Sequence, residues 1–118
     1  MGDCNDANVI VSGVGTERRV SGLIDVGDAT HTWTVNDVAI AMAYAVLSSY
    51  GQQHPKEALV AVAAGYCAQY PLTDVEAAAL PGLVRCRLAT SIACGAFALS
   101  KDPGNEYLKI HAVPARYY

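Results

Sequence analysis

Near the start of the chain, three oxygen-bearing side chains have the types and spacing that phosphoryl transfer needs. Asp3 and Asn8 lie five residues apart in "GDCNDANVIV", and Asp25 ends the short apolar stretch "GLID". A carboxylate can accept the proton of an attacking hydroxyl. Carboxylate and amide oxygens are also the hard ligands that suit Mg²⁺. The three residues therefore form a candidate site that combines a base with a metal.

Two short strands would have to bring these residues together. "NVIVSG" and "RVSGLID" are β-branched stretches separated by the Gly-rich "GVGTER", a pattern that predicts a β-hairpin with strands near 9–11 and 20–24. In protein kinases a loop H-R-D-x-x-x-x-N supplies the base and one metal ligand, and a second Asp on a later turn supplies another. Each element alone also fits a solvated N-terminal turn or an ordinary strand end. Their order, with a hairpin between them, favours phosphoryl transfer.

The most apolar segment of the chain predicts a buried central helix. "VNDVAIAMAYAVLSSYG" is apolar on nearly every face, with a start at Thr34 or Asn36 and a stop at Gly51. Asp37 opens this helix. Its carboxylate can interact favourably with the positive end of the helix dipole, or it can accept hydrogen bonds from backbone N–H groups of the catalytic loop and so hold Asp3 in place. The two roles are compatible.

Further helices follow this segment. Pro55 suits a first helical turn, and the apolar pattern continues to about Tyr70. Thr73 and Glu76 form a capping box that starts the next helix, which Pro81 should kink or restart. The predicted fold class is therefore α+β, with one β-hairpin followed by three to four mostly buried helices.

Composition narrows the class of protein. The 118 residues are 53% hydrophobic and 16% charged, with a net charge of −3, which gives no electrostatic reason to expect binding to nucleic acid or membrane. No uninterrupted apolar run reaches roughly 18 residues, and the polar start does not resemble a secretory signal. The four cysteines form no C-x-x-C pair, which predicts buried, reduced thiols in a cytoplasmic protein.

Three stretches carry a family resemblance. "GDCNDANVIV", "GLIDVGDA" and "NDVAIAMAYAVL" together resemble the C-terminal lobe of the aminoglycoside phosphotransferase and choline kinase-like family, whose loop reads H-G-D-x-x-x-x-N. The resemblance implies a protein-kinase-like lobe, with Asp3 as catalytic base and Asn8 and Asp25 as Mg²⁺ ligands. The later stretch "YPLTDVEAAALPGLVRCRLATSIACGAFALSKDPGNEYLKIHA" narrows this resemblance to a phosphotransferase of lysine catabolism. That narrower resemblance implies transfer of the γ-phosphate of GTP (or ATP) to the hydroxyl of 5-hydroxy-L-lysine.

Residues around the two motifs are candidates for substrate binding. The negative charge of Asp6 or Asp28 could attract an ammonium group of an amino-alcohol substrate. His31 and Trp33 follow the metal-binding Asp in "GDATHTW" and could line the same cleft. A purely structural role in the loop stays open for Asp28, His31 and Trp33.

Two departures from the family pattern shape the expected domain organisation. Met1 stands where the family has His, and the chain begins at the catalytic loop. Residues 1–118 are therefore expected to form a partial domain that lacks the N-terminal lobe, its phosphate-covering loop and its lysine. We expect little turnover from this chain alone, and an apolar face that self-associates or contacts an N-terminal lobe. The alternative function is a catalytically inactive, truncated isoform that acts as a binding module.

Overall fold

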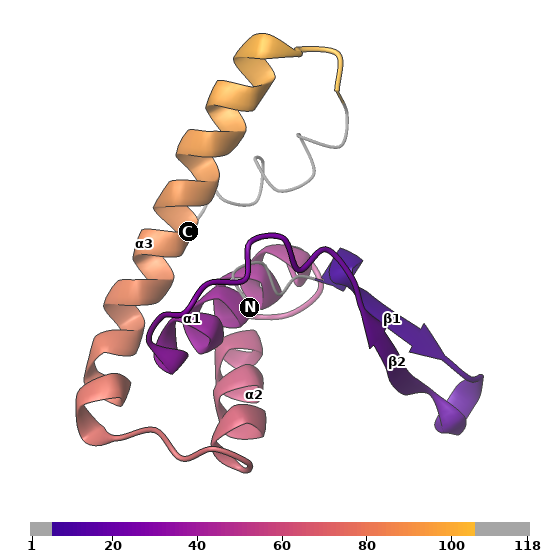
Figure 1. The fold of residues 1–118 in the computed structure, drawn as a ribbon, viewed down its shortest axis with the longest axis vertical. Coiled ribbons are helices and arrows are strands. Elements are labelled where there is room, and N and C mark those ends of the chain that lie inside the picture. Colours follow the sequence, from indigo (N-terminus) through magenta and orange to yellow (C-terminus); the bar gives the residue numbers. More distant parts are fainter. Residues whose placement is uncertain (1–5, 106–118) are drawn as a thin grey trace.

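A β-hairpin joined to three helices makes up the fold (Figure 1), which is the predicted α+β class. The computed structural model describes residues 6–105; Asp3, Cys4 and the C-terminal stretch lie outside that range. The elements in chain order are the 3-10 turn Asp6–Asn8, β1 (Val9–Ser12), the 3-10 turn Gly15–Glu17, β2 (Arg19–Leu23), α1 (Thr34–Ser48), α2 (Pro55–Cys67) and α3 (Asp74–Lys101).

Helix α1 forms the centre of the core, as its composition predicts. It packs against both α2 and α3. Seven of its residues are buried, namely Val35, Val38, Ala39, Met42, Ala43, Val46 and Leu47. From α3 they meet Leu80, Val84 and Leu88, which recur every four residues and so share one face of that helix. Burial of these side chains holds the three helices together.

Helix α1 begins at Thr34, one of the two predicted starts, but the side chain of neither Thr34 nor Asn36 caps it. Trp33 is the N-cap residue, and no side chain caps the helix. Thr34 is already helical, while the Asn36 amide donates a hydrogen bond to the Thr32 hydroxyl at 3.0 Å, away from the orphan N–H groups of the first turn. The end of α1 also agrees with the prediction, because Gly51 follows the helix with φ of 76°, a left-handed conformation that glycine adopts without a steric penalty.

The starts of the other two helices follow their local signals. His54 caps α2 by accepting the backbone N–H of Lys56 on its ring Nδ1 at 3.2 Å, and Pro55 occupies the first turn. In α3 the predicted capping box between Thr73 and Glu76 is present in both directions. Helix α3 continues through Pro81 as one helix, and Figure 1 shows its first turns at an angle to the rest. Pro81 therefore kinks α3 and does not restart it.

Most residues of helix α3 are exposed, so the prediction of mostly buried helices is wrong for α3. Of the described segments, it alone is long and apolar enough to cross a membrane by length and composition, and 11% of the relevant window is buried. Arg85 and Arg87 interrupt the run, which is why no continuous apolar stretch is visible in the sequence. Cys86 and Cys94 are exposed on α3 and Cys67 is half-buried, all three as free thiols. The prediction of buried cysteines is therefore wrong for Cys86 and Cys94, because α3 leaves their faces uncovered.

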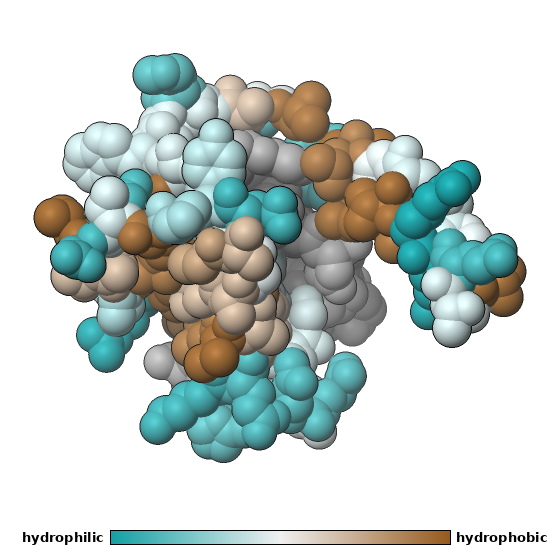
Figure 2. Space-filling view, turned by 90° about the horizontal axis from the view of Figure 1, so that it is seen from below, coloured by the Kyte–Doolittle hydropathy of each residue, from teal (hydrophilic) through white to brown (hydrophobic). Residues whose placement is uncertain are grey.

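The hairpin projects away from the helices (Figure 1). Its strands are antiparallel, with Val9 opposite Leu23 and Ser12 opposite Arg19, and a bulge interrupts the register after Ile10. Figure 2 shows hydrophobic side chains on this projecting part; the exposed large ones are Ile10, Val11, Val14, Val20, Leu23 and Ile24. Two isolated strands are marginal in water, so this surface is suited to being covered by further protein.

Candidate metal and phosphoryl-transfer site

The hairpin brings two of the predicted site residues next to one another along its open end. The backbone N–H of Ile24 donates a hydrogen bond to the carbonyl oxygen of Asn8 at 3.0 Å, which extends the pairing one step beyond Val9 and Leu23. Asp25 directly follows the residue that is paired with Asn8. The return of the chain that the sequence predicts is therefore present in the structure.

Asp25 has a backbone conformation that is unusual for its residue type. Its φ is 54°, and within residues 6–105 it alone among non-glycine residues has a positive φ. Left-handed backbone costs energy for residues with a Cβ, although Asp tolerates it better than most. Such strain tends to persist at functional positions, where the surrounding structure holds it. The conformation turns the chain sharply at the end of β2, and the Asp25 residue is left exposed.

Asn8 lies in a different environment from Asp25. It is 7% exposed, one of two buried polar residues in the described part of the chain, and the other is Ser49. A merely solvated turn does not explain this burial, so that interpretation fails for Asn8. Asp6 belongs to the same 3-10 turn, Asp6–Asn8. Asp3, the predicted base, lies outside the described residues.

The donor types at Asn8 and Asp25 fit Mg²⁺. An amide oxygen and a carboxylate oxygen are hard ligands, and Mg²⁺ is commonly held by one or two carboxylates, with waters and phosphate oxygens in its remaining positions. Across residues 6–105 there is no group of three or more His, Cys, Asp and Glu side chains that could hold a metal ion. Among the described residues, Asn8 and Asp25 are therefore the two candidate ligands for such an ion.

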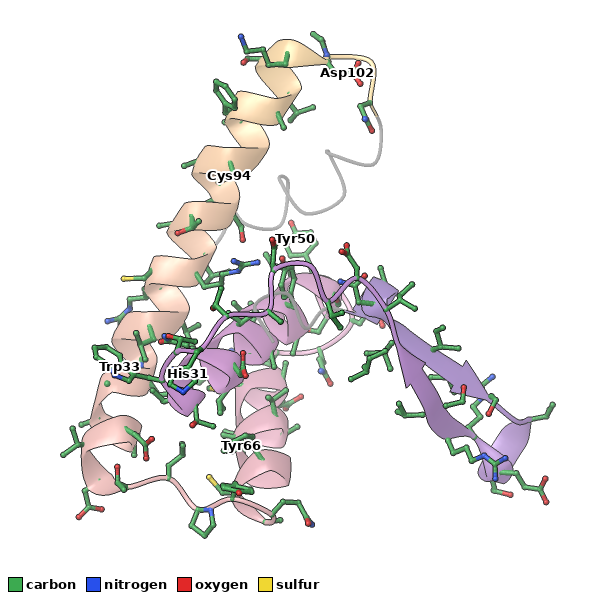
Figure 3. The ribbon with its side chains drawn as sticks, in the orientation of Figure 1. His31, Trp33, Tyr50, Tyr66, Cys94 and Asp102 are labelled. Carbon is green, nitrogen blue, oxygen red and sulfur yellow. The ribbon has the colours of Figure 1, made fainter. Side chains whose placement is uncertain are left out.

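The loop after Asp25 carries two further candidates to the start of α1. A turn in which the Ala29 N–H donates to the Val26 carbonyl at 3.0 Å places Asp28 at its bend, and Asp28 is exposed. His31 is also exposed and lies beside α1 (Figure 3). Both are accessible to a ligand, as substrate-binding side chains must be.

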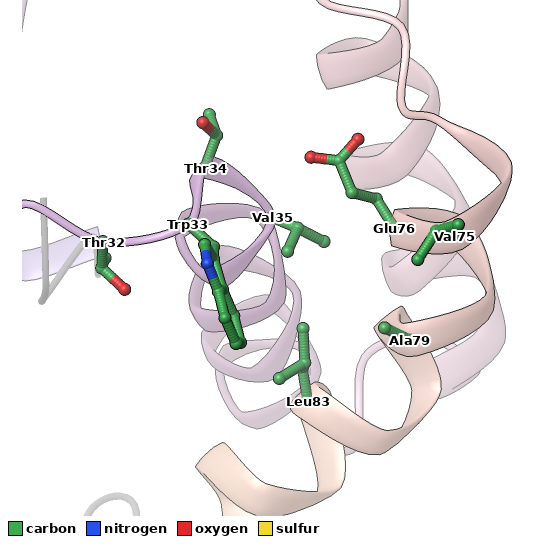
Figure 4. A pocket seen from close by; sticks show the side chains of 8 residues that line it. All are labelled: Thr32, Trp33, Thr34, Val35, Val75, Glu76, Ala79 and Leu83. Carbon is green, nitrogen blue, oxygen red and sulfur yellow. The ribbon is translucent and has the colours of Figure 1, made fainter.

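Two cavities flank the start of α1. The first, here called the Asp37 cavity, has a volume of about 340 Å³ and is lined by Thr30, Thr32, Asn36, Asp37, Ala39, Ile40, Leu83, Cys86, Arg87 and Thr90. Asp37 is half-buried in the first turn of α1, where the helix dipole stabilises a negative charge. The second, here called the Trp33 cavity, has a volume of about 500 Å³ and is lined by Thr32, Trp33, Thr34, Val35, Val75, Glu76, Ala79 and Leu83 (Figure 4).

Sequence reasoning missed the contribution of α3 to both cavities. Glu76 and Ala79 line the Trp33 cavity, and Cys86 and Arg87 line the Asp37 cavity. No local motif marks these residues as site residues, since the capping box identifies Glu76 only as a helix start. They reach the cavities because α3 packs against α1, a tertiary contact with no signal in the sequence.

Comparison with known proteins identifies the family. The chain belongs to the phosphotransferase enzyme family, whose model matches residues 2–80 and therefore spans the hairpin, α1, α2 and the start of α3. This confirms the family resemblance that the motifs carry. No solved structure matches the chain significantly.

The curated proteins that the chain resembles share one name within this family, hydroxylysine kinase. The chain is 36% identical over 118 residues to a hydroxylysine kinase of Mus musculus, which covers 94% of this chain and 30% of the relative. It is 33% identical over 118 residues to the hydroxylysine kinase of Xenopus laevis, at 94% of this chain and 31% of the relative. The hydroxylysine kinase of Danio rerio is 31% identical over 111 residues. The chain thus spans about a third of the length of the curated relatives it matches.

Proposed function

We propose that this chain supplies the catalytic loop and metal-binding hairpin of a phosphotransferase that acts on an alcohol group. The observation that carries the proposal is the pairing of Asn8 with Ile24 next to the strained residue Asp25, at the predicted positions of two metal ligands. Membership of the phosphotransferase family supports it. The domain would be the C-terminal lobe of a protein-kinase-like fold.

In this proposal, each site residue has one task. Asn8 and Asp25 would hold Mg²⁺, which when bound offsets the negative charge of the phosphates. Asp3 would orient the acceptor hydroxyl and take its proton. The hydroxyl oxygen bonds the γ-phosphorus of GTP or ATP, the bond to the bridging oxygen breaks, and the nucleoside diphosphate leaves. Asp37, at the start of the buried helix, would position the loop that carries Asp3.

The acceptor we propose is 5-hydroxy-L-lysine, with GTP as donor. The names of the curated relatives support the acceptor. The negative charges of Asp6 and Asp28 would attract its ammonium groups, and His31 would line the same cleft. Asp28 and His31 are exposed in the loop that directly follows Asp25, which is consistent with this role.

The exposed hydrophobic side chains of the hairpin belong to the same proposal. In a complete enzyme they would be covered by the polypeptide that makes up the rest of the phosphotransferase, or by a second copy of this chain. An inactive binding module is the alternative function, and it would use the same surface. Nucleotide binding separates the two functions.

Calorimetry of Mg²⁺ and GTP binding tests the proposal. The chain should bind Mg²⁺–GTP, and Asp25→Ala should abolish that binding. Asp102→Ala is the matched control, because it removes an exposed carboxylate from the C-cap of α3 and should leave binding unchanged. Equal binding by the chain and by Asp25→Ala would exclude Asp25 as a ligand. Absence of binding in all three proteins would favour the binding module.

A further inference from the structure

The Trp33 cavity has the composition of a small-molecule site, although neither the motifs nor the proposed reaction uses it. Its volume of about 500 Å³ lies within the usual range for ligand pockets. Its walls include the aliphatic side chains of Val35, Ala79 and Leu83, contributed by α1 and α3. Figure 4 shows Trp33 on one side of Val35 and Glu76 on the other.

Trp33 presents an aromatic surface to this cavity that the fold does not use. The residue is 76% exposed, and it occupies the N-cap position of α1. Burying an indole is among the largest hydrophobic gains that a protein can make, and Trp provides the best aromatic face for a cation. An exposed Trp at a cavity wall is therefore suited to contact with a ligand.

Glu76 gives the cavity its negative charge. Its Oε2 accepts hydrogen bonds from the backbone N–H of Thr73 at 2.9 Å and from the Thr73 hydroxyl at 2.7 Å. Both hydrogen bonds lower the pKa of the Glu76 carboxyl, the one from the backbone N–H more than the one from the hydroxyl, and so favour the ionised carboxylate. Both donors are neutral and hold the carboxylate in place without cancelling its charge. None of the described residues that line the cavity is basic.

A neighbouring residue responds to the same negative charge. Burial raises the pKa of the Tyr66 hydroxyl, and the negative charges of Glu76 and Asp37 raise it further. The negative charges of Glu76 and Asp37 thus act on Tyr66, a residue of α2 that does not itself line the cavity. An apolar wall, an aromatic face and an oriented carboxylate are together complementary to an organic cation with a short alkyl body.

We propose that the Trp33 cavity binds an alkylammonium group, with the alkyl chain against Val35, Ala79 and Leu83 and the ammonium between the Trp33 indole and the Glu76 carboxylate. This site involves neither Asn8 nor Asp25, and so it stands independently of the proposed phosphotransferase function.

The intrinsic fluorescence of the protein provides the test, because Trp33 is the single tryptophan in the sequence. n-Butylammonium chloride is titrated at constant ionic strength, with 1-butanol as the neutral ligand of equal size. Saturable quenching or a saturable spectral shift is expected with n-butylammonium, and the affinity for 1-butanol should be at least about fivefold lower, as expected for losing one ionic contact near the surface. Equal affinities for the two ligands, or no saturation with n-butylammonium, would overturn the proposal.

Three variants assign the response to the cavity. Glu76→Gln removes the charge but keeps a capping-box residue, and it should weaken n-butylammonium binding about fivefold. Glu57→Gln removes an exposed carboxylate from the first turn of α2 and should leave affinity unchanged. Ala79→Leu fills the cavity while Glu76 remains, and it should abolish binding. Unchanged affinity in Ala79→Leu would contradict the site even if Glu76→Gln failed to fold.

A fourth variant separates this site from the phosphotransferase site. Asp25→Ala should leave n-butylammonium binding intact while it abolishes Mg²⁺–GTP binding. Loss of both in Asp25→Ala would show that the two sites are not independent, and would overturn the assignment of the alkylammonium to the Trp33 cavity alone.

Discussion

Tyr44 and Arg87 join the two longest helices through a side-chain contact that spans 43 positions of the sequence. The Nη2 of Arg87 donates a hydrogen bond to the Tyr44 hydroxyl oxygen at 2.6 Å, and its guanidinium carbon lies 5.2 Å from the centre of the Tyr44 ring. This contact links the middle of α1 to α3 beside the Asp37 cavity, of which Arg87 is a lining residue.

Tyr44→Phe should lower the free energy of unfolding by about 1–2 kcal/mol, because it removes a part-buried hydrogen bond to a charged donor while it keeps the ring. Urea denaturation measures the change. Tyr70→Phe removes the hydroxyl of an exposed tyrosine and should change stability by less than about 0.5 kcal/mol. Equal effects of the two variants would mean that the contact contributes nothing specific.

Asp25→Gly should separate function from stability. Glycine adopts a φ of 54° without a steric penalty, so the variant should keep its stability or gain up to about 1 kcal/mol. Binding of Mg²⁺–GTP should nevertheless be lost with the carboxylate. Thermal unfolding and calorimetry on the same sample measure the two quantities. A clear loss of stability would show that the Asp25 side chain supports the fold.

Thr73→Ala should weaken the start of α3 by about 1 kcal/mol, because the Thr73 hydroxyl caps the helix. It should also raise the pKa of Glu76 toward the ordinary value for glutamate, since the hydroxyl is one of the groups that lower it. An NMR titration of the Glu76 carboxyl in both proteins provides the measurement. An unchanged pKa would show that the backbone N–H of Thr73 alone is responsible.

The lowered pKa of Glu76 also predicts the direction of a pH dependence. A carboxyl whose pKa is lower in the folded than in the unfolded state stabilises the fold above its unfolded pKa, and this contribution is lost as the pH falls through its folded pKa. Acidification should therefore destabilise the protein more than it destabilises Glu76→Gln. Thermal unfolding at several acidic pH values checks the difference, and parallel curves would exclude the linkage.

Val38→Ala tests whether α1 is the centre of the core. Val38 is 1% exposed, so the substitution removes buried methyl groups and leaves a cavity, at a cost of about 2 kcal/mol. Val60→Ala is the same substitution at a position on α2 that is 65% exposed, and it should cost less than about 0.5 kcal/mol. Chemical denaturation of both proteins measures the difference. Similar losses would contradict a core centred on α1.

Local signals in the sequence determined much of the fold. The β-branched stretches on either side of "GVGTER" predicted the hairpin, and the Thr73–Glu76 capping box predicted the start of α3. The apolar composition of the segment from Thr34 to Ser48 predicted the buried helix α1. These signals work because each structure depends on the preferences of neighbouring residues. The same motifs, with their order and spacing, were also sufficient to identify the phosphotransferase family.

Only the tertiary structure decided which side chains share a site. The burial of Asn8 beside the exposed Asp25, the left-handed backbone of Asp25, and the exposure of Cys86 and Cys94 depend on which elements pack together. The Trp33 cavity depends on it too, because Glu76 comes from a helix that begins some forty residues after Trp33. Contacts between such distant positions carry no local pattern in the sequence, since they arise from packing between helices.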